Sequence, residues 1–143
     1  MTPAAQFMAN IRSELEGAPT QASLLLIAHG SRRKEANDDL DYLAEQLRRK
    51  CRWDCVQTSF LEQSQPTIQE GGALCVAQGA CRVIMLPYFL SSGMHVRDDL
   101  TAARDELVKR FPHVDFVLAE PLGRHPLLVE VVVQRADEAM PGA

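Results

Sequence analysis

Four short apolar segments, each followed by a segment of helical periodicity, constrain the fold of this chain more than any other feature. The apolar segments span Ser23–Ala28, Trp53–Leu61, Cys81–Leu90 and Val114–Gly123. A continuous apolar run of strand length, such as the first, is typical of a parallel strand buried on both faces. Strands that alternate with helices are joined by crossover connections. The sequence therefore predicts an α/β fold with a four-stranded parallel sheet and helices on both faces.

The segments between the predicted strands have sequence features that are typical of helices. In the first, apolar residues recur at helical spacing, and acidic residues precede basic ones, as the helix dipole favours. The predicted helices begin near Ala36, Ser64, Arg97 and Pro126. For the second helix, Ser64 is the expected N-cap, Pro66 lies in the first turn and Gly79 ends it. Gly71 and Gly72 fall inside this helix, where glycine is unfavourable.

Length and composition fit one globular domain. The chain has 143 residues, 46% of them hydrophobic and 24% charged, which is close to the globular average. We expect an N-terminal lead-in over residues 1–20 and a single domain over residues 21–143. The apolar runs are shorter than the roughly 18 to 20 residues that span a bilayer, and the first residues lack the pattern of a secretory signal. We therefore expect a cytoplasmic protein without a membrane partner.

Charge and cysteine spacing narrow the function classes. The net charge is −4, and no basic stripe with interleaved aromatic residues is found, so nucleic acid is not an expected partner. The four cysteines do not show the two-residue gap of common metal-binding pairs. They predict reduced, mostly buried thiols, with an iron–sulfur cluster as the alternative. No P-loop and no GxGxxG motif occurs, so no organic cofactor is expected.

The loops that follow the strands carry most of the chemically active residues. With the flavodoxin-like strand order 2-1-3-4, the first and third strands are neighbours at the switch point, where such sheets bind ligands. His29 follows the first strand, and His95 follows the third. Glu62 follows the second strand. The sequence therefore predicts that two histidines and a carboxylate meet at one edge of the sheet.

These residue types suggest metal and proton chemistry. An imidazole can bind a divalent metal or accept a proton near neutral pH, and Glu62 could add an oxygen ligand or a second base. The same loops carry basic residues that can hold a polyanionic ligand, most plausibly carboxylates: Arg32, Arg33, Lys34, Arg97 and Arg124. Two alternatives stay open, since His29 could satisfy a hydrogen bond at a strand end and Glu62 could cap a helix.

Four motifs, in order, resemble the class II tetrapyrrole chelatases, and most closely the small single-domain sirohydrochlorin cobaltochelatases of the CbiX type. They are LLLIAHGSR, FLEQSQPTIQE, VIMLPYFLSSGMHVRDDL and EPLGRHPLLVEVVVQR. The resemblance extends over Leu24–Arg135, nearly the whole predicted domain. It implies a chelatase-like fold and a lyase-class enzyme. Such an enzyme inserts cobalt, or alternatively iron or nickel, into sirohydrochlorin in cobalamin- or sirohaem-type biosynthesis.

The resemblance also assigns roles to residues. It implies that His29 and His95 bind the metal and accept protons, with Glu62 lining the same cavity as a third catalytic residue. Residues of the first and third loops would bind the tetrapyrrole: Ser31, Arg32, Arg33, Gly93 and Arg97. The divalent metal is a substrate in this reaction. The family's short form usually works as a homodimer, and Phe89, Leu90 and Met94 are candidate contacts beside the strand ends.

The sequence departs from the family pattern at two positions, and two other functions are considered beside the chelatase. Ala28 stands where relatives often have glycine, and Met94 lies next to His95, so the identity of the metal is left open. A histidine phosphatase would need arginine in place of Ala28, which disfavours that class. A metallochaperone or tetrapyrrole carrier, which binds without turnover, would use the same residues and stays open as the alternative.

Overall fold

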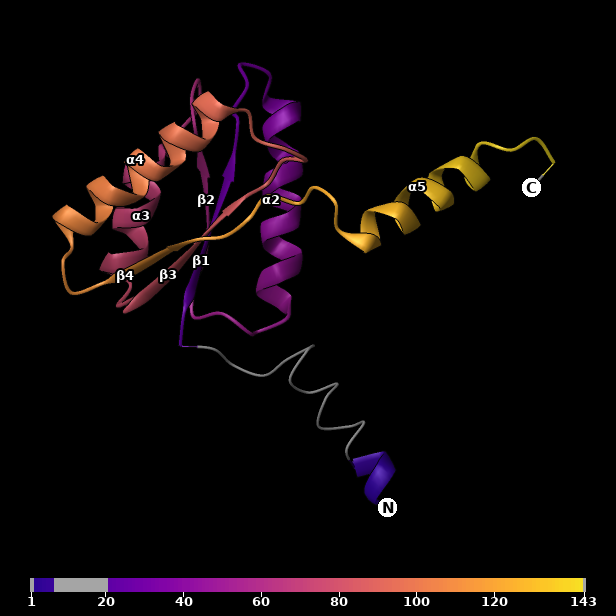
Figure 1. The fold of residues 1–143 in the computed structure, drawn as a ribbon, viewed down its shortest axis with the longest axis horizontal. Coiled ribbons are helices and arrows are strands. Elements are labelled where there is room, and N and C mark those ends of the chain that lie inside the picture. The colour runs from indigo at the N-terminus through magenta and orange to yellow at the C-terminus, as the bar shows by residue number, and fades with distance from the viewer. Residues whose placement is uncertain (1, 7–20, 143) are drawn as a thin grey trace.

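The computed structural model describes residues 2–6 and 21–142 and contains one parallel sheet (Figure 1). Most of the lead-in expected over residues 1–20 lies outside the described residues. The strands are β1 (Ser23–Ala28), β2 (Val56–Phe60), β3 (Arg82–Pro87) and β4 (Asp115–Leu118). All neighbouring strands pair in parallel, and the order is β2-β1-β3-β4. The predicted strand order is therefore confirmed.

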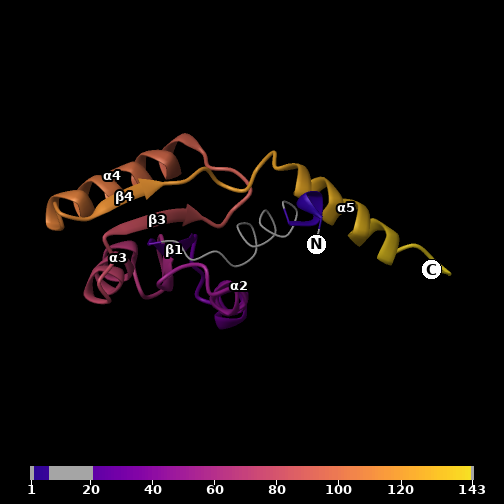
Figure 2. The ribbon, with the colours of Figure 1, turned by 90° about the horizontal axis from the view of Figure 1, so that it is seen from below.

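The helices lie on both sides of this sheet, as predicted. They are α2 (Lys34–Arg49), α3 (Ile68–Ala77), α4 (Met94–Arg110) and α5 (Pro126–Glu138). Helices α3 and α4 lie on one side of the sheet and α2 on the other, whereas α5 points away from it (Figures 1 and 2). In the described ranges, no helix combines the length and the apolar character needed to cross a bilayer.

The alternation of strand side chains creates two buried layers. Leu25, Ile27 and Met85 pack beneath α3 and α4. Leu24 and Leu26 point to the opposite face and pack beneath α2. Burying each such side chain stabilises the fold by about 1.5–3 kcal/mol. β1 is thus buried on both faces, which explains its uninterrupted apolar sequence.

Gly71 and Gly72 allow α3 to approach its neighbours closely. A Cβ atom added at Gly71 would lie 2.8 Å from Cδ1 of Leu25 in β1, and one added at Gly72 would lie 2.7 Å from Cδ2 of Leu107 in α4. The glycines that made this helix uncertain from propensity alone are therefore required by packing.

The predicted start of α3 at Ser64 is wrong. The helix begins at Ile68, because Thr67 is the N-cap and forms a reciprocal capping box with Glu70. The Thr67 side chain accepts from the Glu70 N–H at 3.2 Å, and the Glu70 carboxylate accepts from the Thr67 N–H at 3.3 Å. Ser64 instead contacts the loop after β1. Glu62 caps none of the helices in the described ranges, so that alternative is removed.

The predicted start of α4 at Arg97 is also wrong. The helix begins at Met94, after Gly93 as N-cap, and the Arg97 N–H donates to the Gly93 carbonyl at 3.0 Å. His95 therefore lies in the first turn of α4 and not in the loop before it.

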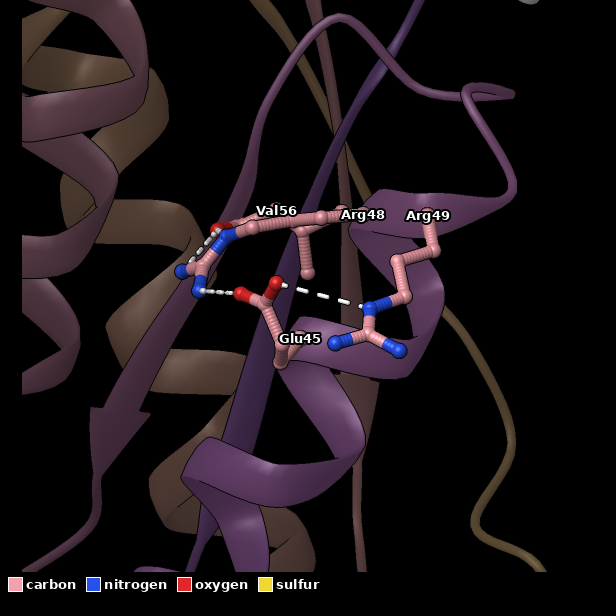
Figure 3. A network of polar contacts seen from close by, with 4 residues as sticks. All are labelled: Glu45, Arg48, Arg49 and Val56. Atoms are coloured by element: carbon pink, nitrogen blue, oxygen red, sulfur yellow. Dashed lines mark hydrogen bonds and ion pairs between the residues drawn. The ribbon is translucent and has the colours of Figure 1, made fainter.

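The end of α2 is attached to the start of β2 by Arg48 (Figure 3). Its Nη2 and Nε donate to the Val56 carbonyl at 2.8 and 3.2 Å. Glu45 forms ion pairs with Arg48 and Arg49 at 3.6 and 3.7 Å. Exposed ion pairs of this kind contribute little stability, so the hydrogen bonds to Val56 are the more important connection.

The start of α5 agrees with the sequence. Pro126 occupies the first turn, and His125 Nδ1 accepts from the Leu127 N–H at 3.2 Å, as expected for a capping histidine. No residue of α5 is buried. His113 lies in an exposed turn.

Candidate functional site

The carboxyl edge of the sheet brings together the loops that follow β1, β2 and β3. The Tyr88 N–H donates to the Ile27 carbonyl at 2.7 Å, and the Leu61 N–H donates to the Ala28 carbonyl at 2.9 Å. These contacts continue the strand pairing beyond the sheet. The segments that carry His29, Glu62 and His95 therefore start from one edge of the sheet, at the switch point between β1 and β3.

His29 is exposed directly after β1. Its ring packs against the ring of Phe89, with centroids 4.5 Å apart and planes tilted by 31°. Within residues 21–142 its side chain makes no hydrogen bond. This argues against the alternative that the histidine serves only to form a hydrogen bond with the backbone at the end of a strand. The ring nitrogens are free to bind a metal or a proton.

Gly30 fixes the loop after β1 against the loop after β2. Its φ is +96°, and an added Cβ would lie 1.8 Å from the carbonyl oxygen of Glu62. The Glu62 N–H donates to the His29 carbonyl at 3.0 Å. Only glycine combines this backbone conformation with this contact. The backbone of Glu62 is thus held beside His29, and its carboxylate belongs to an exposed residue.

Asn37, which the sequence analysis did not single out, holds the same loop from α2. Its Oδ1 accepts from the Ser31 N–H at 3.1 Å, and its Nδ2 donates to the Ser31 carbonyl at 2.9 Å and to Ser64 Oγ at 2.8 Å. Ser64 Oγ donates to the Ser31 carbonyl at 2.8 Å. Asn37 shares a helix face with the buried residues Leu40 and Ala44, and a polar residue on such a face could have indicated this role.

The start of α4 is less constrained. Met94 is 77% exposed, and His95 and Arg97 are exposed too. Gly93 has φ −67°, and an added Cβ would meet nothing within 4 Å. The fold alone therefore does not require glycine at this position, and the role of Gly93 in tetrapyrrole binding stays a prediction.

The basic residues form an open rim around this edge. Arg32, Arg33 and Arg97 are exposed, and in the described part of the chain none of them forms an ion pair. Their charges are free to meet an anion. The Ser31 hydroxyl accepts from the Arg33 N–H at 3.1 Å, which shapes the loop that carries Arg32 and Arg33.

Three small cavities lie along the edge. One of about 230 Å³ is lined by His29, Ser31 and Asn37, among others. Arg97 lines a second of about 320 Å³, and Glu62 lines a third of about 350 Å³. His95 lines none of these three. Among the described residues, no three His, Cys, Asp or Glu side chains lie close enough to hold a metal together. The metal-binding pair His29 and His95 stays a prediction.

The cysteines differ from the expectation that they are mostly buried. Only Cys75 is buried, Cys55 is partly buried, and Cys51 and Cys81 are exposed; all four are free. Burial, together with the neighbouring Cys55, raises the pKa of the Cys75 thiol to about 12. This thiol stays protonated at neutral pH. In the described ranges the four cysteines do not converge, so the iron–sulfur alternative lacks a ligand set.

The strand order defines an α/β protein with a switch point between β1 and β3, the place where parallel sheets of this kind bind ligands. Residues 23–139 match the CbiX family. The chain belongs to the CbiX family, and the resemblance inferred from its four motifs is confirmed.

Two relatives and one solved structure illustrate the match. The chain is 32% identical over 117 residues to the chloroplastic sirohydrochlorin ferrochelatase of Arabidopsis thaliana, covering 82% of this chain and 52% of that protein. It is 29% identical over 117 residues to the sirohydrochlorin cobaltochelatase of Sulfolobus acidocaldarius, covering 82% of this chain and 91% of that one. The sirohydrochlorin chelatase SirB from Bacillus subtilis subspecies spizizenii, in complex with cobalt, superposes with TM-score 0.77 and 27% identity, covering 84% of this chain and 51% of SirB.

Relatives of two lengths are therefore found. The chain spans about half or less of the length of several curated relatives, and nearly the whole length of others.

Proposed function

We propose that this chain inserts a divalent metal ion into sirohydrochlorin, with cobalt(II) as the first candidate and iron(II) or nickel(II) as alternatives. Membership of the CbiX family supports this reaction, as do relatives named for cobalt and for iron. The observation that carries the proposal is a pair of exposed histidines, His29 and His95, that follow the two neighbouring strands at the switch point.

The reaction needs a base as well as a metal ligand. Metal insertion replaces two pyrrole N–H protons, so one metal dication enters and two protons leave. A base beside the metal lowers the barrier to each proton transfer. We assign both metal binding and proton acceptance to His29 and His95, each of which can release the metal and accept one proton. The carboxylate of Glu62 would assist, because its backbone is held next to His29.

The basic rim suits the substrate. Sirohydrochlorin is a polyanion that carries several carboxylates, and exposed arginines without ion pairs can form paired hydrogen bonds to them. We assign Arg32, Arg33 and Arg97 to substrate capture, together with the loop residues Ser31 and Gly93. Capture of a charged ligand mainly increases the association rate and lowers KM.

The edge of a single sheet can contact only one side of a flat macrocycle. We therefore extend the proposal to a homodimer, in which a two-fold axis brings a second copy to the substrate. Leu90 and Met94 are 63% and 77% exposed and can take part in such contacts. Phe89 already packs on His29, so we assign it to the site. We place the enzyme in the cytoplasm, where its substrate would be available.

The direct test is turnover. Purified protein is mixed with sirohydrochlorin and cobalt(II), and insertion is followed by the change in the absorbance spectrum of the macrocycle. We expect insertion to be much faster than the reaction without protein. A protein that binds cobalt and the macrocycle but leaves the insertion rate unchanged would be a carrier, and the proposed activity would be refuted.

A further inference from the structure

One face of the sheet is only half covered. Helix α2 packs on β1 and β2, and among the described residues no helix makes a comparable contact with the same face of β3 and β4, where Ile84 and Leu86 are partly buried against the cluster beneath α2. This half carries Ile84, Leu86 and Val117, which we call the open strip. Ile84 and Val117 are direct neighbours in the strand register. Val117 is 41% exposed. An apolar strip of this kind on a sheet normally lies beneath a helix.

Helix α5 is the complementary case, because it is an apolar helix of which no residue is buried by the described part of the chain. Its exposed fractions include 67% for Leu127, 63% for Val129 and 67% for Val132. The polar residues Glu130 and Gln134 lie on one edge, four positions apart. Apolar side chains occupy more than half of the circumference in the first two turns. A helix with so wide an apolar surface is normally buried.

The turn before α5 directs it away from its own sheet (Figure 2). The Leu122 N–H donates to the Phe89 carbonyl at 3.1 Å. A Cβ added at Gly123 would lie 2.0 Å from the Leu90 carbonyl oxygen, so this part of the turn is packed against the loop after β3. The His125 cap then sets the first turn of the helix. If α5 were to fold back onto its own open strip, these contacts would have to break.

We propose that α5 covers the open strip of a second copy of this chain, and that the second copy returns its α5 in a two-fold exchange. The proposal rests on the homodimer suggested above and gives it an interface. The lengths agree: α5 has 13 residues, or about 20 Å, and β3 has six residues, or roughly 20 Å. The two-fold exchange then buries both helices and both open strips in two equivalent contacts.

A cavity at the base of α5 supports this placement. It measures about 630 Å³ and lies between Leu86 of the open strip and the segment Pro121–Leu128. Apolar side chains from a second copy would fill it. Specific dimers bury at least about 1,200 Å² in total, which favours two helix-on-sheet contacts over one. The polar edge of α5, with Glu130 and Gln134, can remain in water.

Sedimentation velocity at micromolar concentration tests the exchange. The wild-type chain should sediment as a dimer of twice 15.9 kDa. Val132→Glu on α5 and Val117→Glu on the open strip should each raise the dimer dissociation constant at least about a hundredfold, because each buries a charge in the interface. Tyr42→Glu is the matched control, since Tyr42 is 69% exposed on α2 and should leave the dimer intact. Circular dichroism checks that each variant is folded.

Mixing the two monomeric variants sharpens the test. A mixture of Val132→Glu and Val117→Glu chains retains one unaltered helix-on-strip contact per pair, so heterodimers should form at concentrations where each variant alone is monomeric. A monomeric wild type, a dimer that Val132→Glu does not weaken, or a folded mixture without heterodimers would overturn the exchange. Cobalt insertion is measured on the same samples. A wild-type dimer that inserts no metal would refute the proposed function and leave the exchange in place.

Discussion

The two histidines of the site stand in very different surroundings. His29 lies in a loop held by Gly30, by the Glu62 backbone and by the side chain of Asn37, and its ring packs on Phe89. His95 lies in the first turn of α4, after a glycine N-cap without a side-chain hydrogen bond. Its neighbour Met94 is largely exposed. Both histidines are exposed, but the loop of His29 is fixed before substrate binds, whereas the start of α4 that carries His95 is less constrained.

This difference suggests a division of work. A fixed imidazole can hold the metal in one position, which lowers the entropic cost of reaching the transition state. An exposed imidazole at a helix start can approach a macrocycle that enters from solvent. We therefore expect changes around His29 to act mainly on kcat, and changes around the start of α4 to act more on KM.

The largest expected effect follows removal of the fixed histidine. His29→Ala should lower kcat for cobalt insertion by roughly 10²–10⁴-fold, the usual contribution of a positioned acid or base. The measurement is the initial rate at saturating sirohydrochlorin. His113→Ala, in an exposed turn away from the site, is the control and should keep the wild-type rate. Equal rates for the two variants would refute the role of His29.

The second effect tests how firmly the loop is held. In Gly30→Ala, the new Cβ would collide with the Glu62 carbonyl at a φ that disfavours alanine. We expect the free energy of unfolding to fall by at least about 2 kcal/mol, and kcat to fall by about a hundredfold through displacement of His29. Urea unfolding gives the first quantity. Gly93→Ala has open space around it and should keep its unfolding free energy. Equal losses in both variants would contradict the difference between the two regions.

A smaller effect is expected at Asn37. Asn37→Ala removes the side-chain bonds to Ser31 and Ser64, each worth about 1 kcal/mol of stability. The loop should then become less well positioned, and kcat should fall about tenfold with KM nearly unchanged. Steady-state kinetics separate the two constants. If KM rises and kcat does not change, Asn37 contributes to substrate binding and not to the position of His29.

Much of the fold could be predicted from the sequence, because strand-length apolar runs and helical spacing are local patterns. The start of α3 could not, since Ser64 has its partner Asn37 on α2, 27 residues away. The role of Gly71 and Gly72 likewise depends on Leu25 and Leu107, which lie far away along the chain. His29 and His95 stand out in the sequence because each follows a predicted strand at the switch point, and their role stays a prediction, whereas Asn37 does not stand out because its contacts are tertiary.

The smallest effect is expected on the open side. Arg97→Ala should raise KM for sirohydrochlorin several-fold, weaken its dependence on salt and leave kcat nearly unchanged, because Arg97 is exposed and forms no ion pair within residues 21–142. Lys109→Ala removes the same charge at the other end of α4 and serves as the control. A fall in kcat alone would mean that Arg97 acts in the chemical step.

The central claim is that a fixed and an exposed histidine act together on one metal. A double-mutant cycle measures this most directly, with cobalt insertion rates for the wild type, His29→Ala, His95→Ala and the double variant. We expect each single variant to lose most of the activity, and the double variant to be little slower than the slower single variant, because residues that act as a unit are not additive. If the two losses multiply, or if His95→Ala keeps the wild-type rate, the histidines do not share the metal and the account is wrong.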